Sequence, residues 1–346
     1  MEEIFSFYKG KKVFVTGHNG FKGSWMCRIL EDVGAEVCGL SLPVTDDSPF
    51  KAMRLNRTRS IEGDVGSTKE LEDALLSFAP EVAIHMAAQP LVLESYKDPV
   101  RTYMTNVMGT VNFLEAVRKC ESVISVVNVT TDKVYRNMER SEGYAEDEVL
   151  DGHDPYSNSK SCSELVTASY KRSFIENIPV STCRAGNVIG GGDMAKDRLI
   201  PDCVRAAKRK EEIVIRNPNS VRPYQHVLEP VCAYLLLAAR QAEDPELAGS
   251  YNIGPDEEST VTTHRIVQLF CENWEGAGWK ALERTDRPHE AGILRLNCER
   301  FKRTFAWRPR WKIDEAVERT VDWYLAEHDG KDMSKFTAGQ IEQYLG

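Results

Sequence analysis

An apolar run at 12–16 leads directly into three evenly spaced glycines, Gly17, Gly20 and Gly23, and the next segment, 21–33, has apolar residues at helical spacing. In a strand, glycine turn and helix of this kind, the first glycine permits a tight turn and the second lets a pyrophosphate approach the backbone. The third lets the helix pack closely on the strand, and the helix N-terminus attracts the phosphates. The motif therefore predicts a parallel α/β fold that binds a dinucleotide after its first strand.

Strand-like and helix-like segments alternate through the first half of the chain, which is typical of βαβ units. The pattern predicts strands at 12–16, 36–40, 81–85, 123–129 and 179–184, and helices at 21–33, 67–78, 98–119 and 155–177. We expect an α/β fold of the Rossmann type, a doubly wound parallel sheet with a smaller mixed α/β C-terminal substrate domain.

The alternation breaks down after Gly190, which suggests how the chain is divided. The dinucleotide-binding domain is predicted at 1–189, and 228–254 returns to it with a helix at 229–241 and a strand at 250–253. Residues 190–227 and 255–328 are predicted to form the substrate-binding domain. A charged tail follows at 329–346, with a short helix predicted at 337–345 and no readable role.

Charge and composition argue against several classes of protein. The 346 residues carry a net charge of −9, which disfavours a nucleic-acid partner, and the sequence has neither a basic signal-peptide start nor an apolar stretch of membrane-spanning length. The nine cysteines are scattered and never spaced Cys-x-x-Cys. We therefore expect free thiols in a reducing cytoplasm, and neither a disulfide scaffold nor a metal site.

A tyrosine and a lysine one helical turn apart, Tyr156 and Lys160, are the strongest sign of catalysis. Their side chains point from the same helix face, and Asp154 and Pro155 are suited to the start of that helix. A lysine ammonium close to a phenol favours the phenolate and lowers its pKa. The pair therefore predicts a tyrosine that acts as a general base near neutral pH.

A polar run, Thr131, Asp132 and Lys133, follows the strand predicted at 123–129. In open parallel sheets the carboxyl ends of the strands carry the ligand-facing groups, so this run is expected beside the glycine loop and Tyr156. A simple alcohol dehydrogenase does not need the extra acid and base, and these two residues indicate the expulsion of a leaving group. A surface ion pair, and a role for Thr131 in capping the turn, are the alternatives.

The end of the second strand leaves the choice between NAD and NADP open. Ser41, and no carboxylate, stands where an acidic residue often holds the adenosine ribose. Ser41 can bond a ribose hydroxyl, whereas Arg54, Arg57 and Arg59 could tolerate a phosphate. Asp64 is interpreted either as an adenine contact or as a turn or helix-capping residue.

Together these motifs resemble the CDP-glucose 4,6-dehydratase family of extended short-chain dehydrogenase/reductases, over about residues 7–324. The likeness rests on Gly-x-x-Gly-x-x-Gly and Tyr-x-x-x-Lys in this order, and on the runs at 16–23, 85–90, 131–133, 152–160, 184–193 and 222–227. Two departures concern the substrate side: the stretch 137–144 lacks expected tryptophans, and Met194 stands where the family usually has tryptophan.

The resemblance implies a mechanism in which a nucleotide-bound glucose loses water while a bound dinucleotide is reduced and then reoxidised. Tyr156 is the implied base at the sugar O4, which Thr131 orients, and Asp132 is the implied acid for the departing 6-hydroxyl. Lys133 is implied either as the base at C5 or as an electrostatic partner. The implied cofactor contacts are Gly17, Asn19, Gly20, Phe21, Gly23, Ser41, Asp64, Val65, Ala87, Ala88, Gln89, Tyr156 and Lys160. The implied substrate contacts are Gln89, Asn187, Arg198, Arg216, Arg222 and His289.

Two other functions are alternatives on the sequence alone: a nucleotide-sugar 4-epimerase of the same fold and a catalytically silent dinucleotide-binding protein. The Asp132–Lys133 pair argues against the epimerase, and the full catalytic set argues against the silent protein. The resemblance also implies a homodimer or homotetramer, associated through the long helices at 98–119 and 155–177.

Overall fold

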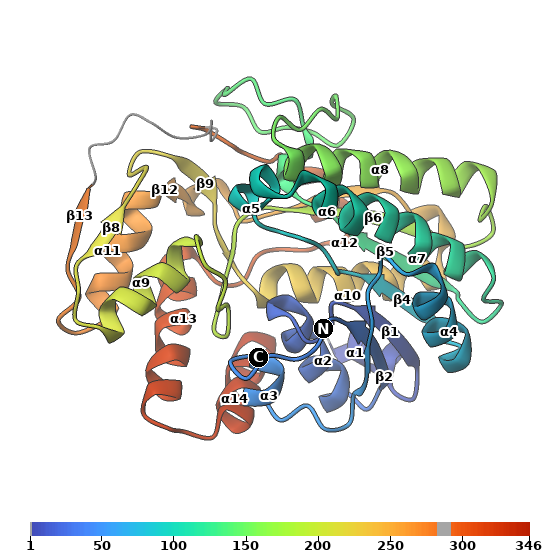
Figure 1. The fold of residues 1–346 in the computed structure, drawn as a ribbon, viewed down its shortest axis with the longest axis horizontal. Helices are drawn as coiled ribbons and strands as arrows, with labels where there is room; N and C mark the ends of the chain where they lie inside the picture. The colour runs from blue at the N-terminus through green and yellow to red at the C-terminus, as the bar shows by residue number, and fades with distance from the viewer. Residues whose placement is uncertain (1, 282–291) are drawn as a thin grey trace.

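The computed structural model describes residues 2–281 and 292–346, and its centre is a parallel sheet of seven strands (Figure 1). The strand order is β11-β6-β5-β4-β1-β2-β3. From β1 the successive strands are added toward one edge of the sheet, and from β4 they are added toward the other, as in doubly wound folds. The strands are β1 Lys12–Thr16, β2 Glu36–Ser41, β3 Arg59–Glu62, β4 Val82–His85, β5 Ser125–Val129, β6 Val180–Ala185 and β11 Ser250–Ile253. The expected Rossmann-type sheet is confirmed.

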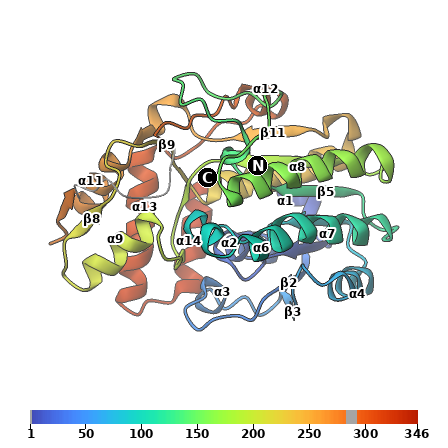
Figure 2. The ribbon, with the colours of Figure 1, turned by 45° about the horizontal axis from the view of Figure 1, so that its top comes forward.

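Helices cover both faces of this sheet (Figures 1 and 2). Side chains alternate across the strands: Val13 and Val15 enter one hydrophobic core and Phe14 enters the other. Helices α2 and α10 pack together on one face, and α4, α7 and α8 pack on the other. Their bounds are α2 Phe21–Asp32, α4 Thr68–Phe78, α7 Gly109–Arg118, α8 Pro155–Ser173 and α10 Leu228–Glu243.

The helix predicted at 98–119 is confirmed in extent, because residues 99–118 form one continuous helical run, but the π-helical turn inside it was not predicted. The run has three consecutive segments. These are α6 Pro99–Tyr103, a π-helical turn at Met104–Met108 and α7. Within the turn, the buried Asn106 accepts a hydrogen bond from the Gln89 backbone N–H at 2.8 Å and donates to Ser159 Oγ at 2.9 Å. In an amphipathic pattern Asn106 looks like an ordinary exposed polar residue, so these buried hydrogen bonds are not visible in the sequence. Short π-helical turns are frequent at functional sites.

Four further elements in the N-terminal half of the chain have weak sequence patterns and were not predicted. They are the edge strand β3 and the helices α1 Glu2–Tyr8, α3 Pro49–Ala52 and α5 Val92–Lys97. Three of the four β3 residues are exposed and none is fully buried. An edge strand with little apolar surface gives almost no period-two signal.

Residues beyond Gly190 form short strands and helices beside the carboxyl end of the sheet. The strands pair two by two: β7 Val188–Ile189 with β10 Gln225–His226, β9 Val221–Pro223 with β12 Thr260–Thr262, and β8 Ile213–Ile215 with β13 Trp279–Ala281. The helices here are α9 Leu199–Lys208, α11 Thr263–Asn273, α12 Glu299–Phe305 and α13 Ile313–His328. Strand β11, at 250–253, lies against β6 at the edge of the main sheet.

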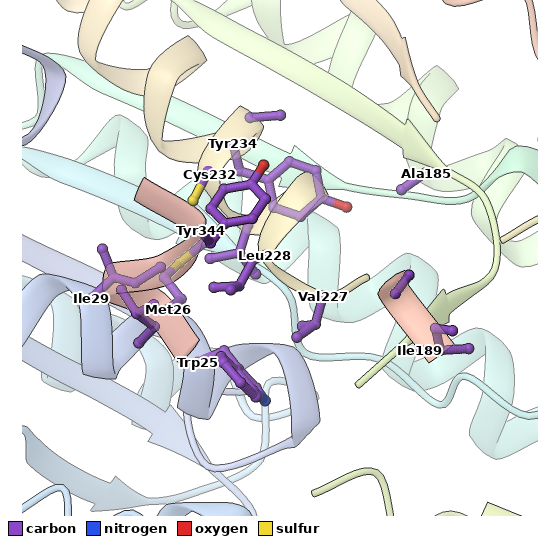
Figure 3. Close-up of a cluster of buried hydrophobic side chains, with 14 of the residues drawn as sticks. Trp25, Met26, Ile29, Ala185, Ile189, Val227, Leu228, Cys232, Tyr234 and Tyr344 are labelled. Atoms are coloured by element: carbon purple, nitrogen blue, oxygen red, sulfur yellow. The ribbon is translucent and has the colours of Figure 1, made fainter. Parts of the chain in front are cut away.

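The tail, which the sequence left without a role, is a helix built into the core. Helix α14, Met333–Leu345, places the buried Tyr344 among side chains of α2 and α10 (Figure 3). The Tyr344 hydroxyl donates to Glu229 Oε2 at 2.6 Å, and Trp323 Nε1 donates to Thr337 Oγ1 at 2.9 Å. The last helix therefore contributes side chains to the largest hydrophobic cluster, which also contains Phe5 near the N-terminus.

All nine cysteines are unpaired, and seven of them are buried. This confirms the expectation of free thiols. Among the helices that the structure describes, none combines the length and the apolar character that crossing a membrane requires.

Candidate active site

The glycine loop between β1 and α2 has the shape that a pyrophosphate requires. Gly17 has a φ of +74°, and a Cβ there would lie 2.9 Å from the Ala87 backbone; a Cβ on Gly23 would lie 2.1 Å from the Gly17 carbonyl oxygen. A Cβ on Gly20 would meet only that carbonyl oxygen, at 3.4 Å. No side chain caps α2 at Gly20, so its first N–H groups are available to an anion. The loop therefore fits a dinucleotide.

The residues predicted to hold the adenosine end are bonded within the protein. Ser41 Oγ lies 2.9 Å from His18 Nδ1, and His18 Nε2 lies 2.7 Å from Ser60 Oγ. Burial lowers the pKa of His18 to about 4, so the imidazole is neutral at physiological pH. Asp64 accepts from the Gly66 N–H at 2.8 Å and Ser67 caps α4, so Asp64 forms a turn in this structure. Val65 is buried in the second core.

The loop after β4 brings Ala87, Ala88 and Gln89 next to the glycine loop. The Ala87 N–H donates to Thr16 Oγ1 at 3.1 Å. The Gln89 amide turns back on its own loop, where it donates to the Leu91 carbonyl and to Thr102 Oγ1 and accepts from the Leu91 N–H. The structure thus gives the Gln89 side chain a role in shaping the loop.

Helix α8 presents Tyr156 and Lys160 at the carboxyl end of the sheet, as predicted. Asp154 accepts from the Ser157 N–H at 3.0 Å and Pro155 occupies the first turn. Lys160 Nζ donates to the Val129 carbonyl at 3.0 Å. Burial lowers the pKa of Lys160 to about 7; the nearby Lys22 lowers it further and Glu164 opposes this.

The expected effect of Lys160 on the Tyr156 pKa is not what the structure gives. Burial raises the pKa of the Tyr156 phenol above its ordinary value, and the groups that pull it down are Lys133, Thr131 and Arg198. The physical reason is that desolvation disfavours the phenolate, while the Lys160 amine is directed at a carbonyl of β5.

Asp132 and Lys133 form an ion pair in which the carboxylate is buried and the lysine side chain is 27% exposed. Asp132 is fully buried, and its Oδ1 accepts from Thr131 Oγ1 at 2.9 Å and from Lys133 Nζ at 2.8 Å. Its Oδ2 has no hydrogen-bond partner within 2–281 and 292–346. Lys133 Nζ also donates to Asn187 Oδ1 at 3.3 Å. Thr131 additionally caps the short turn at Asp132–Val134, which confirms the capping interpretation.

The arginines proposed for the substrate are held by acidic or carbonyl oxygens. Arg198 donates to the buried Asp193 at 2.9 Å and Arg216 to Asp197 at 2.9 Å. Arg222 donates to its neighbouring carbonyl at Val221. Asn187 reaches the catalytic cluster through Lys133, and Arg198 acts electrostatically on Tyr156. His289 lies outside the described residues.

Lys22 is a charged residue of this site that the sequence reasoning missed. It follows Phe21 in the glycine loop, and its Nζ lies 5.6 Å from the centre of the Tyr234 ring. Burial lowers the pKa of Lys22 to about 8, with Asp132 among the groups that oppose this. Its place inside the glycine motif, between Gly20 and Gly23, is the sequence signal that could have identified it.

A doubly wound sheet with this glycine loop, and with a Tyr-x-x-x-Lys helix on the same rim, defines an extended short-chain dehydrogenase/reductase. The model of the family described as GDP-mannose 4,6 dehydratase matches residues 14–320, and the chain belongs to this family.

Comparison with individual proteins is consistent with this family. The chain is 43% identical to CDP-glucose 4,6-dehydratase of Salmonella typhimurium over 98% of each chain, and 26% identical to a probable dTDP-glucose 4,6-dehydratase of Sinorhizobium fredii over 91% of this chain and 93% of the relative. Among solved structures, the epimerase Mth375 of Methanothermobacter thermautotrophicus has a TM-score of 0.83 at 22% identity, covering 94% of this chain and 96% of its own. The dTDP-glucose 4,6-dehydratase DesIV of Streptomyces venezuelae, solved with NAD, has a TM-score of 0.78 at 24% identity, covering 93% of this chain and 99% of its own. These two structures share the fold.

Proposed function

We propose that this protein removes water from CDP-glucose and forms the 4-keto-6-deoxy sugar on the same nucleotide. The observation that carries the proposal is the pair of the buried Asp132 and the partly exposed Lys133, both of which act electrostatically on Tyr156. An epimerase only has to move a proton and a hydride at C4, whereas a dehydratase must also release a hydroxyl. The 43% identity to a CDP-glucose 4,6-dehydratase supports the choice of nucleotide.

The cofactor in this proposal is NAD, held by the loop of Gly17, Gly20 and Gly23. Two of the arginines that could have accepted an NADP phosphate are engaged elsewhere: Arg54 pairs with Asp332 at 3.3 Å, and Arg57 lies 3.7 Å from Glu31. Bound NAD supplies the hydride acceptor for C4 and afterwards the hydride donor for C6.

The side chains handle the protons in this scheme. Tyr156, as phenolate, accepts the O4 proton, and Thr131 orients that oxygen. The 4-ketone makes the C5 proton acidic; Lys133 accepts it in its neutral form, or stabilises the resulting enolate in its charged form. Asp132 then donates a proton to the 6-hydroxyl, which leaves as water and gives a 5,6-alkene. After the hydride returns to C6, a proton must return to C5 to complete the 4-keto-6-deoxy sugar. In this assignment Oδ2 of Asp132 is the free oxygen that carries the proton.

The substrate diphosphate is assigned to Asn187, Arg198, Arg216, Arg222 and His289, which lie on the segments 190–227 and 255–328 or just before them. Guanidinium groups suit this task because they bind phosphate oxygens in pairs. The acids that hold Arg198 and Arg216 keep both guanidinium groups in fixed positions.

Incubation with a panel of nucleotide-glucose compounds, followed by mass spectrometry, tests the proposal. We expect a product lighter by one water from the CDP compound, with no added reductant. With deuterium on C4 of the sugar, the label should appear on the new methyl group. A new isomer of unchanged mass, separated from the substrate by chromatography, would identify an epimerase, and loss of the label to solvent would rule out the internal hydride transfer.

We further propose that the protein forms a homodimer or homotetramer through the helices at 98–119 and 155–177. Exposed apolar side chains support this: Val100, Met104 and Met108 line a shallow groove, and Leu165 is exposed on α8.

Light scattering of a Val100→Glu, Met104→Lys double variant checks this surface. We expect a smaller particle than the wild type, because buried charges oppose association. The matched control is Val214→Glu on β8, which also charges an exposed apolar position and should leave the size unchanged. An unchanged double variant would place the contact elsewhere.

The location proposed for this chemistry is the cytoplasm. Nine unpaired cysteines suit a reducing compartment.

A further inference from the structure

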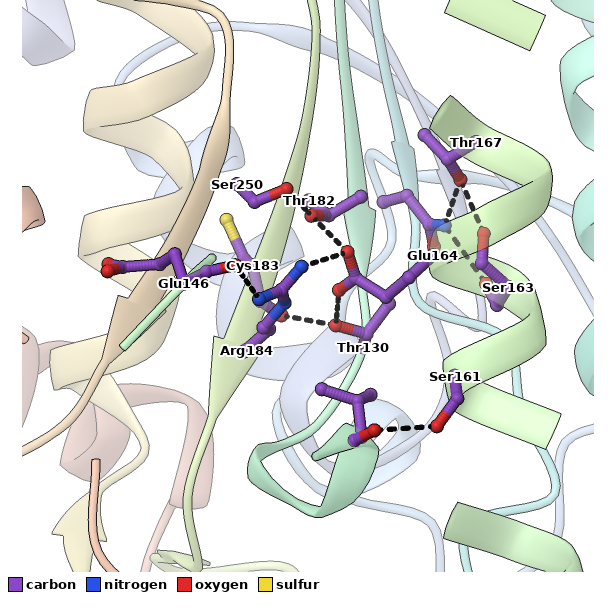
Figure 4. Close-up of polar contacts among 12 residues, drawn as sticks. Thr130, Glu146, Ser161, Ser163, Glu164, Thr167, Thr182, Cys183, Arg184 and Ser250 are labelled. Carbon is purple, nitrogen blue, oxygen red and sulfur yellow. Dashed lines mark hydrogen bonds and ion pairs between the residues drawn. The ribbon is translucent and has the colours of Figure 1, made fainter. Parts of the chain in front are cut away.

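Helix α8 is attached to the end of β5 by hydrogen bonds at three consecutive residues, 128–130, and Figure 4 shows the one between Thr130 and Glu164. Asn128 Nδ2 donates to Ser163 Oγ at 3.0 Å, the Val129 carbonyl accepts from Lys160, and Thr130 Oγ1 donates to Glu164. Thr130 directly precedes Thr131 and Asp132. Glu164 lies one helical turn beyond Lys160 and two beyond Tyr156. This contact therefore joins the two halves of the catalytic cluster.

The carboxylate of Glu164 is the centre of a larger buried network. Besides Thr130, it accepts from Thr182 Oγ1 at 2.7 Å and from Arg184 Nη2 at 2.8 Å, and both members of the ion pair are almost fully buried. Arg184 Nη1 donates to the Tyr135 hydroxyl at 2.8 Å. Thr130 precedes the turn at Asp132–Val134 and Tyr135 follows it. The turn is thus held at both ends by this ion pair.

An ion pair buried this deeply is a poor source of stability, because the cost of removing both charges from water offsets much of their attraction. Apolar side chains could fill the same space. They would, however, make no hydrogen bonds to Thr130 and Tyr135, which lie on either side of the turn. In some proteins buried ionic groups are retained because they specify a single arrangement.

We infer that Glu164, together with Arg184, is a positioning residue for the proposed dehydration: through Thr130 it sets the placement of Asp132 relative to Tyr156. The inference rests on the proposed function and deepens it. Reacting groups must be held within fractions of an ångström, so a small displacement of the turn lowers turnover without weakening nucleotide binding.

The test is Thr130→Val, which removes the hydroxyl bonded to Glu164 and leaves the ion pair with Arg184 intact. We expect kcat for CDP-glucose to fall about tenfold, with KM changed less than about twofold. Thr130→Ser keeps the hydroxyl and should restore most of kcat.

The matched control is Thr182→Val, which removes a hydroxyl from the same carboxylate on the β6 side. Both threonines are buried to a similar degree, so both valine variants should lower Tm by a similar few degrees. Only Thr130→Val should lose kcat. Equal losses in the two variants, or no loss in either, would overturn the inference and leave the ion pair a structural feature. Failure of the proposed function would be seen separately, as wild-type protein that releases no water from any nucleotide-glucose.

Discussion

Tyr156→Phe is expected to lower kcat at least about a hundredfold, because the proposed O4 base is lost while the ring is kept. Burial already raises the pKa of this phenol, and only the charges and hydrogen bonds around it, from Lys133 and Thr131 above all, favour the phenolate. Because burial disfavours the phenolate that Tyr156 needs as a base, its activity depends on these neighbouring groups. Steady-state kinetics and binding of the nucleotide sugar, measured on the same variant, separate the loss of chemistry from a loss of affinity.

Tyr170→Phe provides the control on the same helix. Its hydroxyl contacts Glu115 at 3.4 Å, away from the catalytic cluster, so the variant should keep near-normal turnover. Should Tyr156→Phe also turn over normally, Tyr156 would not be the base, and the assignment of α8 as the catalytic helix would have to be abandoned.

Asp132→Asn is expected to separate the two halves of the reaction. The replacement keeps the size of the side chain and its two partners at Oδ1, Thr131 and Lys133, within reach, but it removes the acid that protonates the departing hydroxyl. Oxidation at C4 should continue and water loss should stall. The reduced cofactor should therefore accumulate on the enzyme, where its absorbance and the absence of the lighter product can be followed together.

Asp151→Asn is the matched control, because Asp151 is half exposed and pairs with Arg136 outside the cluster. It should make product at the wild-type rate. If Asp132→Asn also forms the dehydrated sugar normally, another group, such as Lys133 or Lys22, must assist the leaving hydroxyl.

Most of the main sheet follows from local sequence. All six predicted strands, including the one at 250–253, form near their expected positions, because buried parallel strands are continuous apolar runs with clear limits. The glycine loop and the start of α8 also agree with the structure, because a positive φ at Gly17 and a cap at Asp154 are local requirements. The π-helical turn inside the helix at 98–119 could not be predicted, since the bonds that Asn106 makes join parts of the chain that are far apart in sequence.

The sequence by itself determined the fold class, the dinucleotide loop and the set of residues at the catalytic rim, because each depends on short-range geometry and on the topology of a parallel sheet. Only the tertiary structure decided how those residues are charged and held. Burial lowers the pKa of Lys160 to about 7 and raises that of Tyr156, and Glu164 and Arg184 meet from separate segments to hold the turn that carries Asp132. Desolvation and long-range pairing depend on which groups surround a side chain, and no local pattern in the sequence specifies those neighbours.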